Sequence, residues 1–150
     1  MTSRNTQPTR RIGRSILAGL AGIFTAVVPT LATDALLHAA GLFSSSGHTN
    51  GNAAFLLATI YRTIYGLAGS YATARVAPYR PMAHALVLGA IGTLVNILAA
   101  VATWHKGPEF GPHWYPLALA LLSMPQSWAG ARLFESQLRS TNSFEERTQA

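Results

Sequence analysis

The amino-acid sequence predicts an all-α membrane protein whose four transmembrane helices form an antiparallel, up-and-down bundle. Of 150 residues, 49% are hydrophobic and only 11% are charged, whereas about a quarter of the residues of a soluble domain are charged. Four long apolar stretches cover residues 16–42, 53–77, 82–104 and 114–134. Basic residues mostly flank these stretches. Together these observations favour a chain that crosses a lipid bilayer repeatedly.

Each apolar stretch meets the length of roughly 20 residues that a helix needs to cross about 30 Å of hydrocarbon. A membrane β-barrel would alternate apolar and polar residues over about ten positions, and these stretches do not. A cleaved signal peptide ending near Ala32 or Ala35 is a competing interpretation of the first stretch. We favour a retained span, because the apolar run continues past Asp34 to Leu42.

The distribution of charge predicts that both chain termini face the cytoplasm. Basic residues gather in the tail 1–14, in the connection 75–80 and from residue 132 onward, as the positive-inside rule requires of cytoplasmic segments. The connection 43–52 has no Lys or Arg, and the third connection offsets Lys106 with Glu109. The net charge of +6 therefore indicates orientation in a bacterial inner membrane and not nucleic-acid binding. We expect the residues before Arg10 and after Ser140, in the tails 1–14 and 136–150, to be loose.

Two ionisable residues, Asp34 and Arg62, lie well inside apolar stretches. Asp34 is eight residues before Leu42 and Arg62 is nine after Ala53, so they fall at nearly equal depth on adjacent antiparallel helices. A charge inside a bilayer is costly and normally finds a partner. The sequence therefore predicts an ion pair between the first two helices.

The same counting adds Asn96 and Ser123, which lie eight residues before Trp104 and nine after Trp114. At about 1.5 Å per residue, this polar layer lies roughly 12 to 14 Å below the outer helix ends. His38 is one turn from Asp34 and Tyr65 is close to one turn from Arg62, so both are candidate members. The layer fixes helix register in one interpretation. In the other it is a proton or substrate site in which Asp34 titrates.

No residue pattern indicates an enzyme, a cofactor or a metal centre. The sequence lacks a P-loop, a dinucleotide glycine fingerprint, a nucleophile elbow and a zinc helix. His48, His105 and His113 share the outer side with Glu109, but their spacing matches no compact ligand motif. An intramembrane enzyme acting on a lipid would depend on Asp34, His38 and His84, and it is the least supported class.

Small residues repeat every four positions within the apolar stretches, as in helices that pack closely in lipid. They are Ala18 with Gly22, then Gly66, Ser70 and Ala74, then Ala85, Gly89 and Thr93. Pro29 and Pro125 each remove a helical hydrogen bond, which predicts kinks in the first and fourth helices.

Four strings carry a resemblance: TDALLHAAG, YRTIYGLAGSYATARVAP, HALVLGAIG and GPHWYPLALALL. Together they resemble a group of small, functionally uncharacterised bacterial membrane proteins with four helices. The resemblance implies the fold and brings no activity. It also implies that the shared pattern includes Asp34, His38, Arg62, Tyr65, His84 and Trp114. Small multidrug exporters share the size and the four helices, but not the late position of Asp34 or the arginine at its level.

The sequence leaves two functional hypotheses. The first is a non-enzymatic structural or accessory membrane component whose partners are the bilayer and either further copies or other membrane subunits. The alternative is a small homodimeric, proton-coupled transporter or channel that uses the layer around Asp34 and Arg62.

Overall fold

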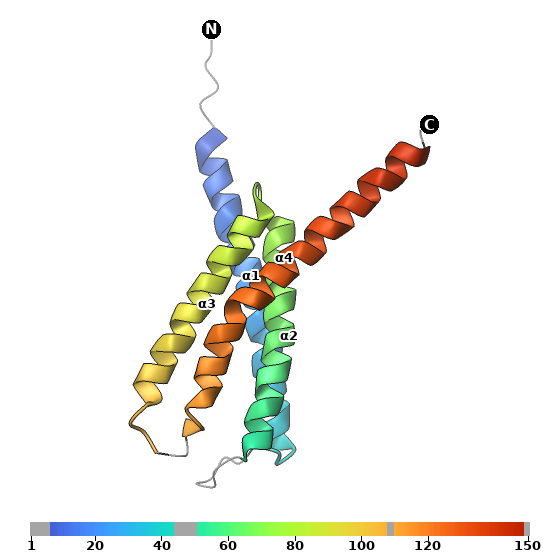
Figure 1. Cartoon of the computed structure of the whole chain (residues 1–150). Helices are drawn as coiled ribbons and strands as arrows, with labels where there is room; N and C mark the ends of the chain where they lie inside the picture. The colour runs from blue at the N-terminus through green and yellow to red at the C-terminus, as the bar shows by residue number, and fades with distance from the viewer. Residues whose placement is uncertain (1–6, 44–50, 108–109, 149–150) are drawn as a thin grey trace.

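A computed structural model describes residues 7–43, 51–107 and 110–148, with the side chains of 12–43, 51–107 and 110–141. Within these ranges the chain consists of helices α1 (Gln7–Ala39), α2 (Asn52–Val76), α3 (Pro81–Thr103) and α4 (Trp114–Thr148), and it has no strand. The predicted all-helical fold with four helices is confirmed. Figure 1 shows both termini at the end of the bundle that carries the α2–α3 turn, and the other two connections at the opposite end.

The helices do not pack equally on one another. α1 packs along α2, α2 along α4, and α4 along α3; α2 also contacts α3, while α1 contacts α3 only lightly. The bundle is therefore closed at three contacts between helices and open where α1 faces α3.

Local sequence explains where two of the helices begin and end. α1 stops at Ala39, three residues before the predicted end at Leu42, because Gly41 has a left-handed backbone (φ +72°) and the Leu42 N–H donates to the Leu37 carbonyl oxygen at 3.0 Å. α3 begins with Pro81 at its first position, where the missing N–H costs no helical hydrogen bond.

The outer helices extend beyond the predicted spans. α1 begins at Gln7 and α4 continues to Thr148, so most of the predicted basic and polar tails is helical. The expectation of a loose segment after Ser140 is wrong for residues up to Thr148. The reason is local: between Phe134 and Thr148 the sequence contains no Gly or Pro to stop the helix. Pro29 and Pro125 lie inside helices, as predicted, and α4 changes direction partway along its length in Figure 1.

The interior is built from small residues. Ala18, Ser70, Thr73, Ala74, Ala85 and Ala131 are at most 1% exposed, and the largest fully buried side chains are Thr73 and Ser70. A Cβ added at Gly22 would lie 2.8 Å from the Gly69 carbonyl oxygen, and one at Gly89 would lie 2.7 Å from the Ser127 Cβ. The predicted small-residue faces are therefore the helix contacts.

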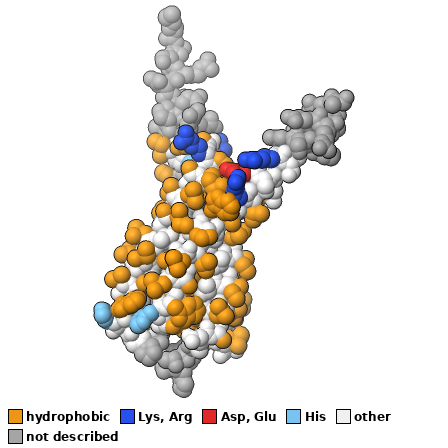
Figure 2. Space-filling view, in the orientation of Figure 1, with side chains coloured by type: hydrophobic (Ala, Val, Ile, Leu, Met, Phe, Trp, Pro, Cys, Tyr) orange, Lys and Arg blue, Asp and Glu red, His pale blue; other side chains and the backbone are white. Residues whose placement is uncertain are grey.

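Large apolar side chains face outward. Leu36, Val101 and Leu121 are 70%, 70% and 77% exposed. Figure 2 shows hydrophobic side chains spread over the body of the bundle, with Lys and Arg gathered near the end that carries the termini. Two helical segments, Ile12–Ala39 and Pro81–Thr103, are long and apolar enough to cross a membrane. Four spans were predicted; the polar side chains of α2 and α4 lower their hydropathy.

Candidate functional site

Asp34 and Arg62 form an ion pair between α1 and α2, as the counting of depth predicted. The Arg62 Nη2 donates to the Asp34 Oδ2 at 2.7 Å, and the two side chains are 35% and 24% exposed respectively. The pair lies level because the connection after Ala39 returns the chain antiparallel to α1. Each charge is thus neutralised by a residue at the same level of the facing helix.

Two tyrosines that were not predicted to belong to the layer complete the surroundings of the pair. The hydroxyl of the buried Tyr61 donates to the Asp34 Oδ1, and the ring of Tyr115 lies 5.8 Å from the Arg62 guanidinium carbon. Both carboxylate oxygens of Asp34 therefore accept a hydrogen bond. The only sequence signal for Tyr61 is its place directly before Arg62, and an adjacent position on a helix does not predict a shared face.

Tyr65 and His38, the two candidate neighbours of the pair, make other contacts than those predicted. The Tyr65 hydroxyl lies 3.0 Å from the Thr33 Oγ1, so Tyr65 bridges α2 to α1 without contacting Arg62 through a hydrogen bond. The His38 Nδ1 donates to the backbone carbonyl oxygen of Asp34 at 2.7 Å, and its ring lies 5.4 Å from that of Phe43. His38 therefore interacts with the backbone and not with the carboxylate, because its short side chain reaches the carbonyl one turn back.

Asn96 and Ser123 lie in the same layer as the pair but do not hydrogen-bond to it. The Asn96 Nδ2 donates to the Gly92 carbonyl oxygen at 2.9 Å, and the Ser123 Oγ to the Leu119 carbonyl oxygen at 2.7 Å. Each bond stays within its own helix, as is common for short polar side chains. Asn96 and Ser123 therefore share a cavity lining with the ion pair but no hydrogen bond with it.

The residues of the layer line one cavity of about 390 Å³, which opens to the surface and is lined by residues from all four helices. Its polar lining consists of Thr30, Asp34, Arg62, Asn96, Ser123 and Gln126. Gln126 was missed by the sequence reasoning, although it follows Ser123 by three residues and so shares its face. Its amide packs against Gly66, where an added Cβ would lie 2.5 Å from the Gln126 Nε2.

The polar atoms of this cavity have unused hydrogen-bonding capacity. The Arg62 Nε is buried and has no partner among the described residues. The Asn96 side-chain oxygen and the Gln126 side-chain amide also have no hydrogen bond to any described residue. The cavity can therefore hold a small polar group or water against a neutralised ion pair. It contains a carboxylate, a guanidinium, amides and two hydroxyls, and the hydroxyls of Thr30 and Ser123 donate to backbone carbonyl oxygens of their own helices.

The three residues of the lipid-enzyme hypothesis do not come together. The His84 Nε2 lies 3.0 Å from the Ser15 Oγ, and Ser15 is nineteen residues before Asp34 on α1, which is about 28 Å along the helix axis. The side chain of His38 is exposed, outside this cavity. A shared catalytic centre of Asp34, His38 and His84 is therefore excluded by distance.

Among the described residues, no three His, Asp or Glu side chains come together as a metal site would require. The His113 Nε2 donates to the Trp104 carbonyl oxygen at 3.0 Å, and its ring stacks on Trp104 with centroids 4.6 Å apart. His105 is exposed in the α3–α4 connection. His48 and Glu109 lie outside the described residues.

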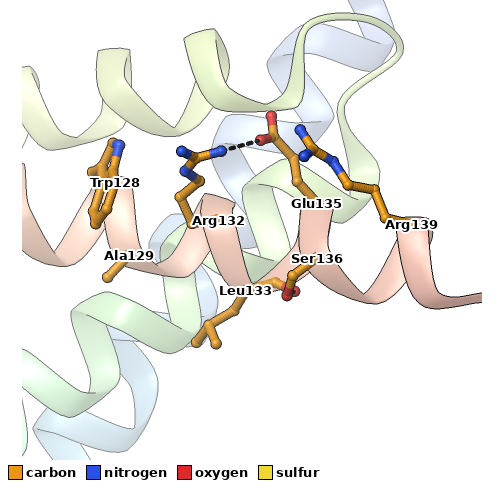
Figure 3. Close-up of a pocket in the computed structure, with 7 residues that line it drawn as sticks. All are labelled: Trp128, Ala129, Arg132, Leu133, Glu135, Ser136 and Arg139. Carbon is orange, nitrogen blue, oxygen red and sulfur yellow. Dashed lines mark hydrogen bonds and ion pairs between the residues drawn. The ribbon is translucent and has the colours of Figure 1, made fainter.

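A second hollow, of about 450 Å³, lies along the part of α4 that leaves the bundle (Figure 3). The Arg132 guanidinium carbon is 5.5 Å from the centroid of the Trp128 ring, and its Nη1 is 3.9 Å from the Glu135 Oε2. All of its lining residues come from α4. It is thus a face of one helix and not an enclosed site.

Comparison of the chain with protein-family models, with curated proteins and with solved structures gives no match. The resemblance suggested by the sequence strings therefore stays a prediction, and the function of the chain is inferred from its sequence and geometry alone.

Proposed function

We propose that this chain is a non-enzymatic, four-span integral membrane protein of a bacterial inner membrane that acts as a structural or accessory component. The observation that carries the proposal is the inverted burial of the bundle. Leucines and valines are up to 77% exposed, while alanine, glycine, serine and threonine fill the interior. This arrangement would expose a large apolar surface to water, whereas lipid solvates such a surface and small residues let the helices approach closely.

The positions of charged residues support the orientation and the two less apolar spans. Arg14, Arg75, Arg80, Arg132 and Arg139 belong to the end of the bundle that carries the termini, which favours a cytoplasmic location for that end. The Arg62 charge in α2 is paired with Asp34. Polar residues of α4, such as Ser123 and Ser127, are 2% exposed. Four spans therefore leave no unpaired charge of α2 or α4 facing lipid at the depth of Asp34.

The accessory role is supported by the state of the ion pair and by the open side of the bundle. Both carboxylate oxygens of Asp34 accept hydrogen bonds from α2, one from Tyr61 and one from Arg62, and these bonds hold α1 against α2. α1 contacts α3 only lightly, and the cavity beside the pair is open. A second polypeptide would cover the cavity beside the pair. We also propose membership of the group of small four-helix membrane proteins that the sequence resembles.

Single-cysteine labelling tests the membrane placement, because the natural chain has no cysteine. Ser46→Cys should react with a membrane-impermeant maleimide in intact spheroplasts. Ser143→Cys should react only after the membrane is permeabilised. The proposal would be overturned if residue 46 reacted only after permeabilisation and residue 143 reacted in intact spheroplasts. Recovery of the chain in the aqueous phase without detergent would also overturn it.

Purification in mild detergent tests the accessory role. We expect other membrane subunits to co-purify, and we expect the chain alone in liposomes to give no ion flux. Recovery of this chain by itself, together with flux in liposomes, would contradict the role.

A small homodimeric, proton-coupled transporter is the second candidate, and the lining of the cavity by Asp34, Arg62, Asn96, Ser123 and Gln126 favours it. Its test is proton flux into liposomes, followed with an entrapped pH-sensitive dye. Flux that disappears in Asp34→Asn and Arg62→Gln would support transport through this layer. Flux that survives both substitutions would exclude these residues from the mechanism.

A further inference from the structure

A third cavity lies where α1 faces α3, at the end of the bundle that carries the termini. Its volume is about 550 Å³. The apolar wall consists of Ile12, Ile16, Ile23, Val87, Leu88 and Ile91, and most of these side chains are also exposed at the surface. The cavity is therefore an apolar groove between two helices that barely touch, and we call it the α1–α3 groove.

Four polar residues of the groove gather at one of its ends, and a fifth, the buried Thr73 of α2, lies deeper in the groove beside Gly22. The His84 Nε2 lies 3.0 Å from the Ser15 Oγ, and the His84 Nδ1 is 3.3 Å from the Arg80 carbonyl oxygen. The Tyr79 ring meets that of His84 edge-on, with centroids 5.1 Å apart. These four residues line the groove, and the charged side chain of Arg80 is exposed. The groove thus has a basic mouth and an apolar body.

The backbone at this mouth is held in an uncommon conformation. Arg80 has φ 42° and ψ 64°, the left-handed region, although it precedes Pro81 and proline disfavours helical angles in the residue before it. Such conformations cost about 1 to 3 kcal/mol and persist where the surroundings impose them. Here the turn brings the Arg80 carbonyl oxygen to His84, which keeps both residues at the mouth.

The length of the groove matches one leaflet of a bilayer. The lining runs from Ile12 to Ile23 on α1, and from Arg80, the cap of α3, to Ile91. Each range has twelve residues, whose eleven helical steps cover about 16 Å. Half of a hydrocarbon core is about 15 Å. Gly19 lines the groove, and a Cβ built on it would meet nothing within 4 Å. Space is therefore open along the middle of the groove.

We propose that the α1–α3 groove binds one anionic phospholipid of the cytoplasmic leaflet. An acyl chain lies over Gly19 between the isoleucines of α1 and the apolar face of α3, and the phosphate lies at the mouth beside Arg80 and His84. This inference rests on the proposed membrane placement of the chain. A phospholipid fits better than a helix from a second copy, because the exposed polar groups of the groove lie at one end only, Thr73 being buried, and the groove ends at the depth of one leaflet.

Native mass spectrometry of the chain, purified in mild detergent and supplied with phospholipids, tests the proposal. We expect one phosphatidylglycerol to be retained in preference to phosphatidylcholine. Gly19→Leu should lower this retention by about tenfold, because its side chain occupies the volume of one or two buried methylene groups of the lipid. Gly13→Leu is the matched control, since its Cβ also meets nothing within 4 Å but Gly13 does not line the groove; this variant should retain lipid as the natural chain does.

The mouth is tested separately. Arg80→Gln should lower the preference for phosphatidylglycerol by about fivefold, the contribution of one basic residue near an anionic surface, while phosphatidylcholine retention stays the same. Equal retention by the Gly19→Leu variant, or equal retention of both lipids by the natural chain, would overturn the proposal. So would a disulfide-linked dimer formed by Gly19→Cys in place of lipid retention. A detergent-soluble chain without lipid refutes this proposal alone, whereas a chain that is soluble without detergent refutes the membrane placement.

Discussion

The contacts of α1 with its two neighbours differ in almost every respect. Toward α2, the Gly22 and Gly69 backbones approach closely, and the Asp34–Arg62 pair adds an ionic bond. Toward α3, the contact is light, and Ser15 with His84 forms the polar contact at one end of the α1–α3 groove. Both sides of α1 carry large apolar residues, yet only one side is closed.

The difference teaches what closes a helix contact when lipid is the solvent. Apolar side chains gain little from meeting each other instead of lipid, so close backbone approach and hydrogen bonds decide the packing. α2 meets α1 with Gly69, where an added Cβ would lie 2.6 Å from the Gly22 carbonyl oxygen. α3 places Leu88 and Ile91 at the groove. The small residues of α2 and the large residues of α3 thus explain why α1 packs closely along α2 and not along α3.

The ion pair should dominate the closed contact. Asp34→Asn and Arg62→Gln each leave one charge without its partner, so each should lower the free energy of unfolding in detergent by about 3 to 5 kcal/mol. The exchange of the two residues, Asp34→Arg with Arg62→Asp, should recover part of this loss. Thermal unfolding followed by circular dichroism measures all three variants. Equal stability of the natural chain and the three variants would show that the pair does not hold α1 to α2.

The hydroxyl of Tyr61 should contribute next, because it donates to the charged Asp34. Tyr61→Phe should cost about 1.5 to 3 kcal/mol, the range for a hydrogen bond to a charged group. Tyr79→Phe is the control, since the Tyr79 ring is exposed on the other side of α1. The same unfolding assay applies. A loss in the control as large as that in Tyr61→Phe would place the effect outside the ion pair.

Backbone approach can be tested with a single methyl group. At Gly22 an added Cβ would lie 1.9 Å from the Thr73 Oγ1 and 2.8 Å from the Gly69 carbonyl oxygen, so Gly22→Ala should destabilise the bundle by about 1 to 3 kcal/mol through overpacking. Gly19→Ala meets open space and should be neutral or stabilising by up to about 1 kcal/mol, from helix propensity. Equal values for the two variants would remove close approach as the cause of the asymmetry.

The open contact should respond least. Ser15→Ala removes the hydroxyl that lies 3.0 Å from the His84 Nε2, and a hydrogen bond of this kind contributes about 0.5 to 1.5 kcal/mol net. The free energy of unfolding, measured beside that of Gly22→Ala, checks the order. A loss above that of the Asp34→Asn variant would mean that α1 depends on α3 more than on α2.

Part of this arrangement could be predicted from the sequence, and the reason is geometric. A helix advances by about 1.5 Å per residue, so counting from the connections placed Asp34, Arg62, Asn96 and Ser123 at one depth, and all four line one cavity. Counting gives depth but not rotation. It could not show that Asn96 and Ser123 bond within their own helices.

The rest depended on contacts that hydropathy does not encode. A leucine facing lipid and a leucine facing a helix look alike in sequence, so the open side between α1 and α3 was not predicted. Tyr61 was missed because adjacent residues on a helix point in different directions, and only the rotation of α2 brings its hydroxyl to Asp34. The extension of α4 to Thr148 was missed because polar residues were taken as the end of a helix and not only of a span.

The lengths of the outer helices have a mechanical consequence. α1 has 33 residues and α4 has 35, so each is about 50 Å long, against a hydrocarbon thickness of about 30 Å. Both prolong the bundle on the side of the termini and diverge there (Figure 1). Stiff rods turn a small tilt at their base into a larger sideways displacement at their tips. The distance between fluorophores attached near residues 7 and 148 would therefore change more than the distance between the helices inside the bundle when either helix tilts.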